Sequence, residues 1–291
     1  MLLERLGIWP ARVAWFLLPA LIGPAAASGL DNRSDAVQLV AEILMWAAWF
    51  VGMVCLFAPN TVSLTLFRIV APGSGLAAAL LTLAGTPSPG RAALAAFGAA
   101  LATGFAFLAP TGDVMVNGSA YGPERRLALR TPASLLIGPI PVAWALLVAT
   151  VVLGPLTLAS QRWVVGGILT ILAVPFAYVV GRSLHQLSRR WIVFTPAGFV
   201  IHDYFVLAES ILLKRSDIAE LGPAPADPKG TLDISAGAKG LALQVEAKEP
   251  LSVVVRDGRN AAVTETVRLI FTPTLPGRLL REARIRGINV T

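Results

Sequence analysis

The chain has 291 residues, of which 55% are hydrophobic and only 14% are charged, whereas a soluble domain averages about 25% charged residues. This composition indicates a membrane protein. The net charge of +7 comes without an arginine-rich helix, an RNP-like aromatic motif or zinc-finger spacing, so we expect no nucleic-acid partner. The single cysteine, Cys55, leaves one chain with neither a disulfide framework nor a thiolate metal site.

Six stretches of the chain are long and apolar enough to cross a bilayer, which takes about 20 residues for a helix. We expect membrane helices near residues 11–30, 36–58, 61–85, 91–110, 133–158 and 162–181. The first stretch ends in Ala25-Ala26-Ala27, which also fits a signal-peptidase site after a short apolar core. The sequence leaves both interpretations open. Cleavage would not change the topology of the later helices.

The distribution of arginines predicts the orientation of these helices. If the N-terminus lies inside, only Arg33, Arg91 and Arg162 lie outside. The arginines then at the inner side are Arg5, Arg12, Arg68, Arg125, Arg126, Arg130, Arg182, Arg189 and Arg190. By the positive-inside rule, we expect a multi-pass protein of the cell membrane with both termini in the cytoplasm.

Two ionisable residues within the expected helices, Glu42 and Arg68, are functional candidates because such residues are rare in membranes. A helix rises 1.5 Å per residue, which places the two at opposite depths and argues against an ion pair. We interpret each as reaching its own interface with a long side chain. Residues 72–75 and 138–141, rich in Gly and Pro, interrupt two helices, and we interpret these interruptions as packing kinks. A small transporter or channel subunit using Glu42 and Arg68 is the alternative function.

From Trp191 onward the hydrophobic pattern changes to that of short strands. Leu241–Ala247, for example, alternates apolar and polar residues, as a half-buried strand does. We expect about seven strands, in antiparallel order, across residues 191–271. An amphipathic helix follows at Leu275–Arg286, and Thr274 is its expected cap.

Seven short strands followed by one helix is the element order of a pleckstrin-homology-like (PH-like) barrel. The stretch RWIVFTPAGFVIHDYFVLAESILLKRSDIAEL resembles the opening of bacterial PH-like domains, in which a T-x-x-G turn and an ILL-x-R-x-x-I strand recur. The matching positions are Thr195, Gly198, Ile211-Leu212-Leu213, Arg215 and Ile218. The layout is similar to an uncharacterised family of multi-pass membrane proteins of GC-rich Gram-positive bacteria with a C-terminal PH-like domain. The resemblance covers residues 188–291 and carries no catalytic residues.

We therefore predict an α-helical membrane bundle of about six spans in residues 1–187, which ends in a basic hinge. A small, mainly β PH-like barrel with one C-terminal helix follows in residues 188–291. The chain contains His185 and His202 but no G-x-S-x-G, H-E-x-x-H, P-loop or G-x-G-x-x-G motif. His202 beside Asp203 would need a placed nucleophile to form a triad. We expect no catalytic residue, no cofactor and no metal.

The favoured function is binding of protein or lipid by a cytoplasmic PH-like module that the membrane helices present. We expect the chain to be a scaffold or regulatory subunit of an envelope process and not an enzyme. The expected partners are the anionic lipids of the inner leaflet, which basic clusters attract by about 1 kcal/mol per charge, and an unknown protein. Equally, these clusters could serve topology alone. The expected surface for membrane or partner binding consists of Arg125, Arg126, Arg130, Arg182, Arg189, Arg190, Arg278 and Arg281. Small residues such as Gly98 and Ala102 permit close helix packing and a homo-oligomer.

Overall fold

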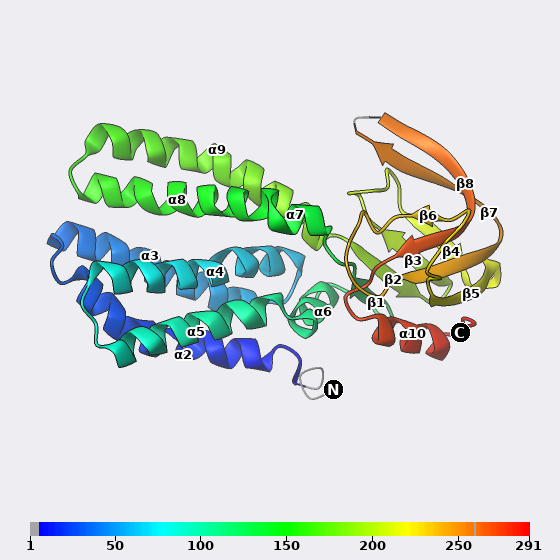
Figure 1. The fold of residues 1–291 in the computed structure, drawn as a ribbon, viewed down its shortest axis with the longest axis horizontal. Coiled ribbons are helices and arrows are strands. Elements are labelled where there is room, and N and C mark those ends of the chain that lie inside the picture. Colours follow the sequence, from blue (N-terminus) through cyan, green and yellow to red (C-terminus); the bar gives the residue numbers. More distant parts are fainter. Residues whose placement is uncertain (1–5, 259) are drawn as a thin grey trace. The chain divides into compact units, whose positions relative to one another are not determined.

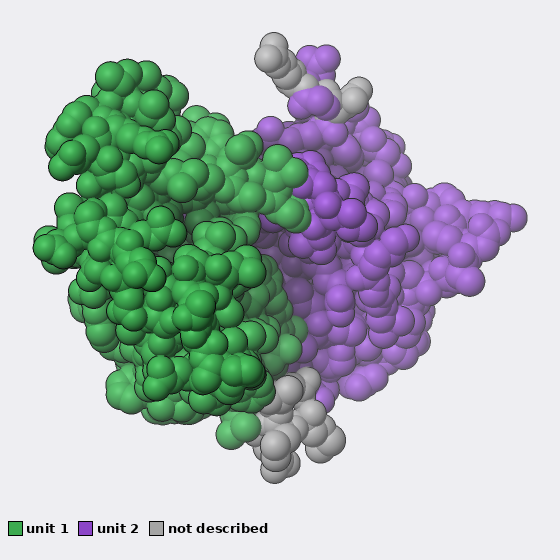
Figure 2. Space-filling model, turned by 60° about the vertical axis from the view of Figure 1, so that its left-hand side comes forward, with its two compact units in different colours: residues 1–115, 141–184 green, residues 116–140, 185–291 purple. Residues whose placement is uncertain are grey.

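The computed structural model describes residues 6–258 and 260–291. The chain forms two compact units, which Figure 2 shows in separate colours. The first, here the helical unit, extends up to residue 115 and includes residues 141–184; the second, here the β unit, comprises residues 116–140 and 185–291. Arg5, one of the arginines expected inside, lies outside the described residues.

Among the described residues, six helical segments have the length and apolar composition needed to cross a membrane (Figure 1). They are α2 (Trp9–Leu30), α3 (Asp35–Phe57), α4 (Thr61–Ala84), α5 (Pro89–Phe107), α7 with α8 (Ala133–Ile137 and Pro139–Ala159) and α9 (Trp163–Ser188). The six expected membrane helices are confirmed, and their length and composition mark the chain as a multi-pass membrane protein. The last helix continues beyond its expected end at residue 181.

Small residues share the interior of the bundle that α2, α3, α4 and α5 form with larger side chains such as Trp15 and Phe67. Ala25, Ala95 and Ala102 are fully buried, so the helix backbones approach closely, as is common where lipid surrounds a bundle. Two tryptophans link α2 to α3. The Nε1 of Trp15 donates to the carbonyl of Trp49 at 2.8 Å, and the Nε1 of Trp49 donates to the carbonyl of Trp15 at 3.0 Å. These bonds satisfy two N–H groups that lipid cannot.

Of the two interruptions expected from the sequence, one is present. Helix α4 runs without a break through Pro72, so the expected interruption at residues 72–75 is absent, and a packing kink within the continuous helix stays a prediction. The hydroxyls of Ser74 and Thr103 both donate to the carbonyl of Ala71, next to Pro72. The second interruption is confirmed, because Gly138, with φ −120° and ψ −84°, separates α7 from α8.

The β unit contains two four-stranded sheets and one C-terminal helix. The sheet orders are β1-β2-β3-β4 and β5-β7-β8-β6. The elements are β1 (Arg125–Ala128), β2 (Trp191–Thr195), β3 (Gly198–His202), β4 (Ile211–Lys214), β5 (Ile218–Pro223), β6 (Leu232–Asp233), β7 (Leu243–Asp257), β8 (Asn260–Phe271) and α10 (Pro276–Ile285). Both sheets and the helix share one core, to which Phe194, Phe271 and Leu279 contribute.

The two sheets do not close into a barrel within the described residues, and the predicted PH-like barrel is not confirmed. A 3₁₀ turn at Arg215–Asp217 separates β4 from β5, which pair with different neighbours. Strand β6 pairs with β8 in parallel, contrary to the antiparallel expectation. The two strands expected around residue 250 form the single strand β7, whose register shifts between Glu246 and Leu251. Pro250 lies in this shift, where its missing N–H breaks no ladder bond.

Strand β1 comes from a segment that the sequence analysis treated as a loop between membrane helices. A short helix, α6 (Ala109–Asn117), precedes it. Strand β1 pairs antiparallel with β2, with Leu127 opposite Ile192, although α7, α8 and α9 lie between the two strands in sequence. Residues 116–140 are therefore part of the β unit, and the expected boundary at residue 187 misses them. Four strand residues are too few to give a recognisable alternation.

The C-terminal helix is confirmed, with a different start. Its first turn has no side-chain cap. The expected cap, Thr274, instead donates its hydroxyl to the carbonyl of Ala128 at 3.0 Å, and the Thr274 N–H donates to the same carbonyl at 2.9 Å. The segment before α10 is thereby bonded to the end of β1, which places the helix beside that strand.

Candidate functional site

A groove of about 430 Å³ lies between β1 and α10 of the β unit. It is lined by Arg125, Leu127, Arg278, Arg281, Glu282 and Ile285. Three of these residues, Arg125, Arg278 and Arg281, belong to the surface predicted from the sequence. The fold brings them together from two segments that are far apart in the chain. We call this site the basic groove.

Strand geometry decides which of two neighbouring arginines reaches the basic groove. Successive side chains of a strand point to opposite faces, so Arg125 and Leu127 share the groove face and Arg126 points to the other. On that other face the guanidinium of Arg126 lies 5.6 Å from the ring centre of Trp191. The basic cluster read from the sequence is therefore divided between two faces of β1.

Helical spacing sets the second wall. Arg278, Arg281 and Ile285 recur at i, i+3 and i+7 and so lie on one face of α10. Leu279 and Ala283, at 1% and 0% exposure, are buried in the core. Because these two residues fix the rotation of the helix, the arginines are held toward the groove.

The arginine Arg286, which does not line the groove, connects its two walls. Its Nε donates to Oε1 of Glu282 at 2.7 Å, and its Nη2 donates to the carbonyl of Pro123 at 2.6 Å. Pro123 lies two residues before Arg125, at the start of β1. The bond therefore ties α10 to the turn that leads into the opposite wall, and the carboxylate of Glu282 is paired with a cation outside the lining.

The charges around the groove suit a phosphate group. Three guanidinium groups and one carboxylate line it, and that carboxylate is the one paired with Arg286. The planar guanidinium fork binds the oxygens of phosphate or carboxylate bidentately. A phosphate group offers two or three such oxygens on one small centre and is negatively charged at pH 7.

The sequence analysis did not assign Glu282, Ile285 or Leu127 to this site. The spacing of Glu282 and Ile285 from Arg278, four and seven residues, is a signal that could have found them once a helix was predicted there. No comparable signal exists for Leu127, because its contribution depends on β1 folding across from α10.

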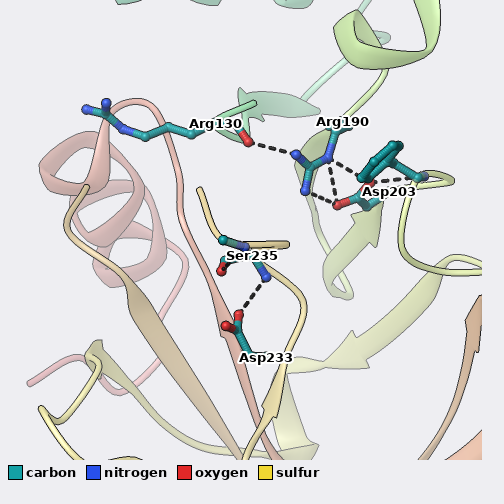
Figure 3. A network of polar contacts seen from close by, with 7 residues as sticks. Arg130, Arg190, Asp203, Asp233 and Ser235 are labelled. Carbon is teal, nitrogen blue, oxygen red and sulfur yellow. Dashed lines mark hydrogen bonds and ion pairs between the residues drawn. The ribbon is translucent and has the colours of Figure 1, made fainter. Parts of the chain in front are cut away.

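Arg190, which the sequence analysis placed in the binding surface, lies in the interior. Its side chain is 1% exposed, and that of its partner Asp203 is fully buried. The Nε and Nη2 of Arg190 donate to the Asp203 carboxylate at 2.7 to 2.9 Å, and Nη1 donates to the carbonyl of Arg130 at 2.8 Å (Figure 3). A guanidinium in this position cannot meet a ligand. This part of the predicted surface is corrected to a structural role.

The remaining arginines of the predicted surface do not line the basic groove. The guanidinium of Arg189 lies 5.8 Å from the ring centre of Tyr204. Arg130 is exposed at the end of the β1 segment, and Arg182 is exposed on α9 in the helical unit. The structure therefore separates the eight predicted arginines into one groove, one buried pair and scattered surface positions.

The two intramembrane candidates do not meet. Glu42 is exposed on α3, and it forms no ion pair with Arg68 in the part of the chain that the structure describes, as the depth argument predicts. Arg68 is partly buried on α4. Its Nε donates to the carbonyl of Ala106 at 3.3 Å, and its guanidinium lies 5.6 Å from the ring centre of Phe107. Arg68 thus contacts the end of α5. The sequence had predicted that its side chain reaches the membrane interface.

His202 is not part of a catalytic dyad with Asp203, because that carboxylate is bonded to Arg190. A contact that the sequence analysis missed joins Nδ1 of His202 to Oγ of Ser210 at 3.0 Å. The other ring nitrogen, Nε2, is buried without a hydrogen-bond partner. A serine–histidine pair whose imidazole has no carboxylate lacks the group that orients the ring and stabilises its protonated form.

The surroundings of His202 favour its neutral form. Its ring stacks on Trp191 with a centroid distance of 4.9 Å and meets the edge of Tyr204 at 4.4 Å. Burial, and then the positive charge of Arg189, lower the pKa of His202 below its usual value of 6.5. The residue is therefore uncharged at neutral pH.

No group of three or more His, Cys, Asp or Glu side chains able to hold a metal occurs within residues 6–258 and 260–291. Comparisons with protein-family models, with curated proteins and with solved structures found no match. No family is thereby identified. The function is argued from the basic groove alone.

Proposed function

We propose that the chain is a non-enzymatic integral membrane protein that presents a cytoplasmic binding module, and that the basic groove binds a phosphate-bearing anion. The convergence of Arg125, Arg278 and Arg281 around one groove is the observation that carries this proposal. Six spanning helices anchor the module. Binding at the groove would serve a scaffold or regulatory subunit of an envelope process, the role proposed for a PH-like module.

The convergence of three guanidinium groups supports a binding role. An anion held in the groove would interact favourably with all three. Burial of Leu279 and Ala283 and the bonds of Arg286 hold these arginines around one space.

The phosphate could belong to a lipid headgroup of the anionic inner leaflet or to a soluble phosphorylated molecule, because both offer the same oxygens to the arginines. The topology predicted from the arginine distribution places the β unit in the cytoplasm, where both are present. A protein partner and self-association remain predictions of the sequence.

The test uses the full chain in nanodiscs of phosphatidylcholine, which carry no net charge. Inositol hexakisphosphate is titrated in and its binding is measured by calorimetry. A hydrogen bond to a charged group contributes about 1.5 to 3 kcal/mol, so the double variant Arg278→Gln with Arg281→Gln, which loses two such groups, should bind at least about 100-fold more weakly. Equal affinity of the variant and the unaltered chain would contradict the proposal.

A second pair of nanodiscs distinguishes the two sources of phosphate. Phosphatidylglycerol is added to the bilayer, and the same titration is repeated. If the groove takes headgroups of its own bilayer, the lipid competes, and the apparent affinity for the soluble anion falls in the unaltered chain but not in the double variant. If the ligand is soluble, the affinity does not depend on the anionic lipid beyond what the double variant shows.

A further inference from the structure

Two adjacent aromatic side chains are exposed in the loop between β3 and β4. Tyr204 is 38% exposed and Phe205 is 42% exposed. Elsewhere in the β unit the large aromatic residues of the sheets, such as Phe194 and Phe199, are buried in the core. Two neighbouring exposed rings form a candidate contact surface, whereas exposed apolar side chains that occur singly need no partner.

The loop that carries these rings is held in place by hydrogen bonds. Asp203 accepts from the N–H of Phe205 through its side chain at 3.2 Å and from the N–H of Leu207 through its carbonyl at 2.8 Å. Leu207 is fully buried and belongs to the core. Tyr204 and Phe205 therefore project from an ordered turn, and their exposure is a fixed feature of the fold.

The same turn is tied to the end of a membrane-spanning helix. Asp203 immediately precedes Tyr204, and its buried partner Arg190 lies two residues after Ser188, the last residue of α9. Two residues of chain span at most about 7 Å. The bidentate pair thus holds the aromatic turn close to the point where α9 ends.

The length of α9 places that point at the bilayer surface. With 26 residues, the helix is about 39 Å long at 1.5 Å per residue. The hydrocarbon core is about 30 Å thick, and the bilayer with its headgroups is about 40 to 45 Å thick. A spanning helix of this length reaches from one surface of the bilayer to the other, so its C-terminal end emerges at the surface of the leaflet that it crosses last.

We infer that Tyr204 and Phe205 form an aromatic anchor that docks on the headgroup layer of the leaflet from which α9 emerges. Tyrosine is enriched at membrane–water interfaces, and Phe205 adds an apolar ring beside Tyr204. One cation accompanies the rings, because the guanidinium of Arg189 lies 5.8 Å from the ring centre of Tyr204. The guanidinium of Arg190, 5.5 Å from the ring centre of Phe205, is buried and paired with Asp203. The anchor is separate from the basic groove and does not depend on the ligand proposed there.

The test measures the depth of a spin label in the full chain, in nanodiscs of phosphatidylcholine with phosphatidylglycerol. Cys55, the single cysteine, is replaced by alanine, and one label is attached through Phe205→Cys. The control label is attached through Val263→Cys, on β8, which is 67% exposed. We expect the ratio of oxygen to nickel-chelate accessibility to be several-fold higher at position 205 than at position 263.

Equal ratios at the two positions would overturn the inference, and so would a label at position 205 that neither reagent reaches, because that outcome means contact with protein. A label through Tyr204→Cys repeats the measurement if the first variant fails to fold. Each labelled chain is first compared with the unlabelled chain by circular dichroism. None of these outcomes bears on anion binding at the basic groove, so the two proposals stand or fall separately.

Discussion

The surroundings of Arg190 and the basic groove show two uses of one side chain within the β unit. Arg190 is 1% exposed and is held by Asp203, whereas Arg281 is exposed and faces an open groove. Both belong to the arginines that composition and position marked as a binding surface. The contrast shows that a basic residue near a membrane helix becomes a binding residue only where the fold leaves its guanidinium accessible.

The largest effect is expected from removing β1. A chain of residues 188–291 lacks Leu127 and Leu129, at 2% and 6% exposure, and loss of one buried leucine side chain costs about 2 to 5 kcal/mol. We expect this fragment to unfold at a much lower urea concentration than a fusion in which residues 116–131 are joined to residue 188 by a short Gly/Ser linker. Circular dichroism measures both transitions. Equal stability would mean that β1 is not part of the unit.

The next effect concerns the buried pair. Arg190→Met leaves the Asp203 carboxylate buried without its cation, which costs about 3 to 5 kcal/mol. We expect the double variant with Asp203→Leu to recover much of this loss, since no unpaired charge remains. Arg284→Met, an exposed change on α10, is the control and should shift stability by less than about 0.5 kcal/mol. A single variant as stable as this control would refute the structural role of Arg190.

The two faces of β1 give a comparison within one dipeptide. Arg125→Gln should weaken binding of inositol hexakisphosphate by about 10-fold, because a charged hydrogen bond is lost. Arg126→Gln should leave the affinity unchanged, since that side chain lies against Trp191 on the opposite face. Calorimetry on the full chain in phosphatidylcholine nanodiscs checks both. Equal losses would show that long-range charge, and not the groove, determines binding.

The smallest effect is a pH dependence from His202. Its pKa is lower in the folded chain than the usual 6.5, so the unfolded chain takes up the proton first as the pH falls. The stabilisation is fully present above pH 6.5 and is lost as the pH falls through the lower, folded value. The urea midpoint of the β1 fusion should therefore decrease between pH 7.5 and 5.5. The decrease should be smaller in His202→Phe, which keeps the ring stack; an identical decrease would assign the effect to other groups.

The elements set by composition and period were predictable from the sequence. Six apolar helices and the C-terminal helix are read from hydropathy and helical spacing, which need no knowledge of distant contacts. The arginines of α10 were named for the same reason. Strand β1 was missed because it has only four residues and pairs with β2, from which two membrane-spanning segments separate it in the sequence.

The burial of Arg190 was equally out of reach of the sequence. Nothing in its neighbourhood distinguishes it from Arg189, which precedes it directly. Its position depends on the turn at Asp203 and on the carbonyl of Arg130, both of which come from other segments of the fold. The groove depends likewise on β1 lying beside α10. The sequence could therefore name its arginines but could not predict that they lie around one groove.

The central claim, that the basic groove binds a phosphate-bearing anion, is tested most directly by two substitutions on one helix. Arg281 and Arg284 are both exposed on α10, but only Arg281 lines the groove. The measurement is the dissociation constant of inositol hexakisphosphate for Arg281→Gln and Arg284→Gln in the full chain in phosphatidylcholine nanodiscs. The account predicts binding about 10-fold weaker for the first and unchanged for the second. Equal constants for the two variants, or no binding by the unaltered chain, would contradict it.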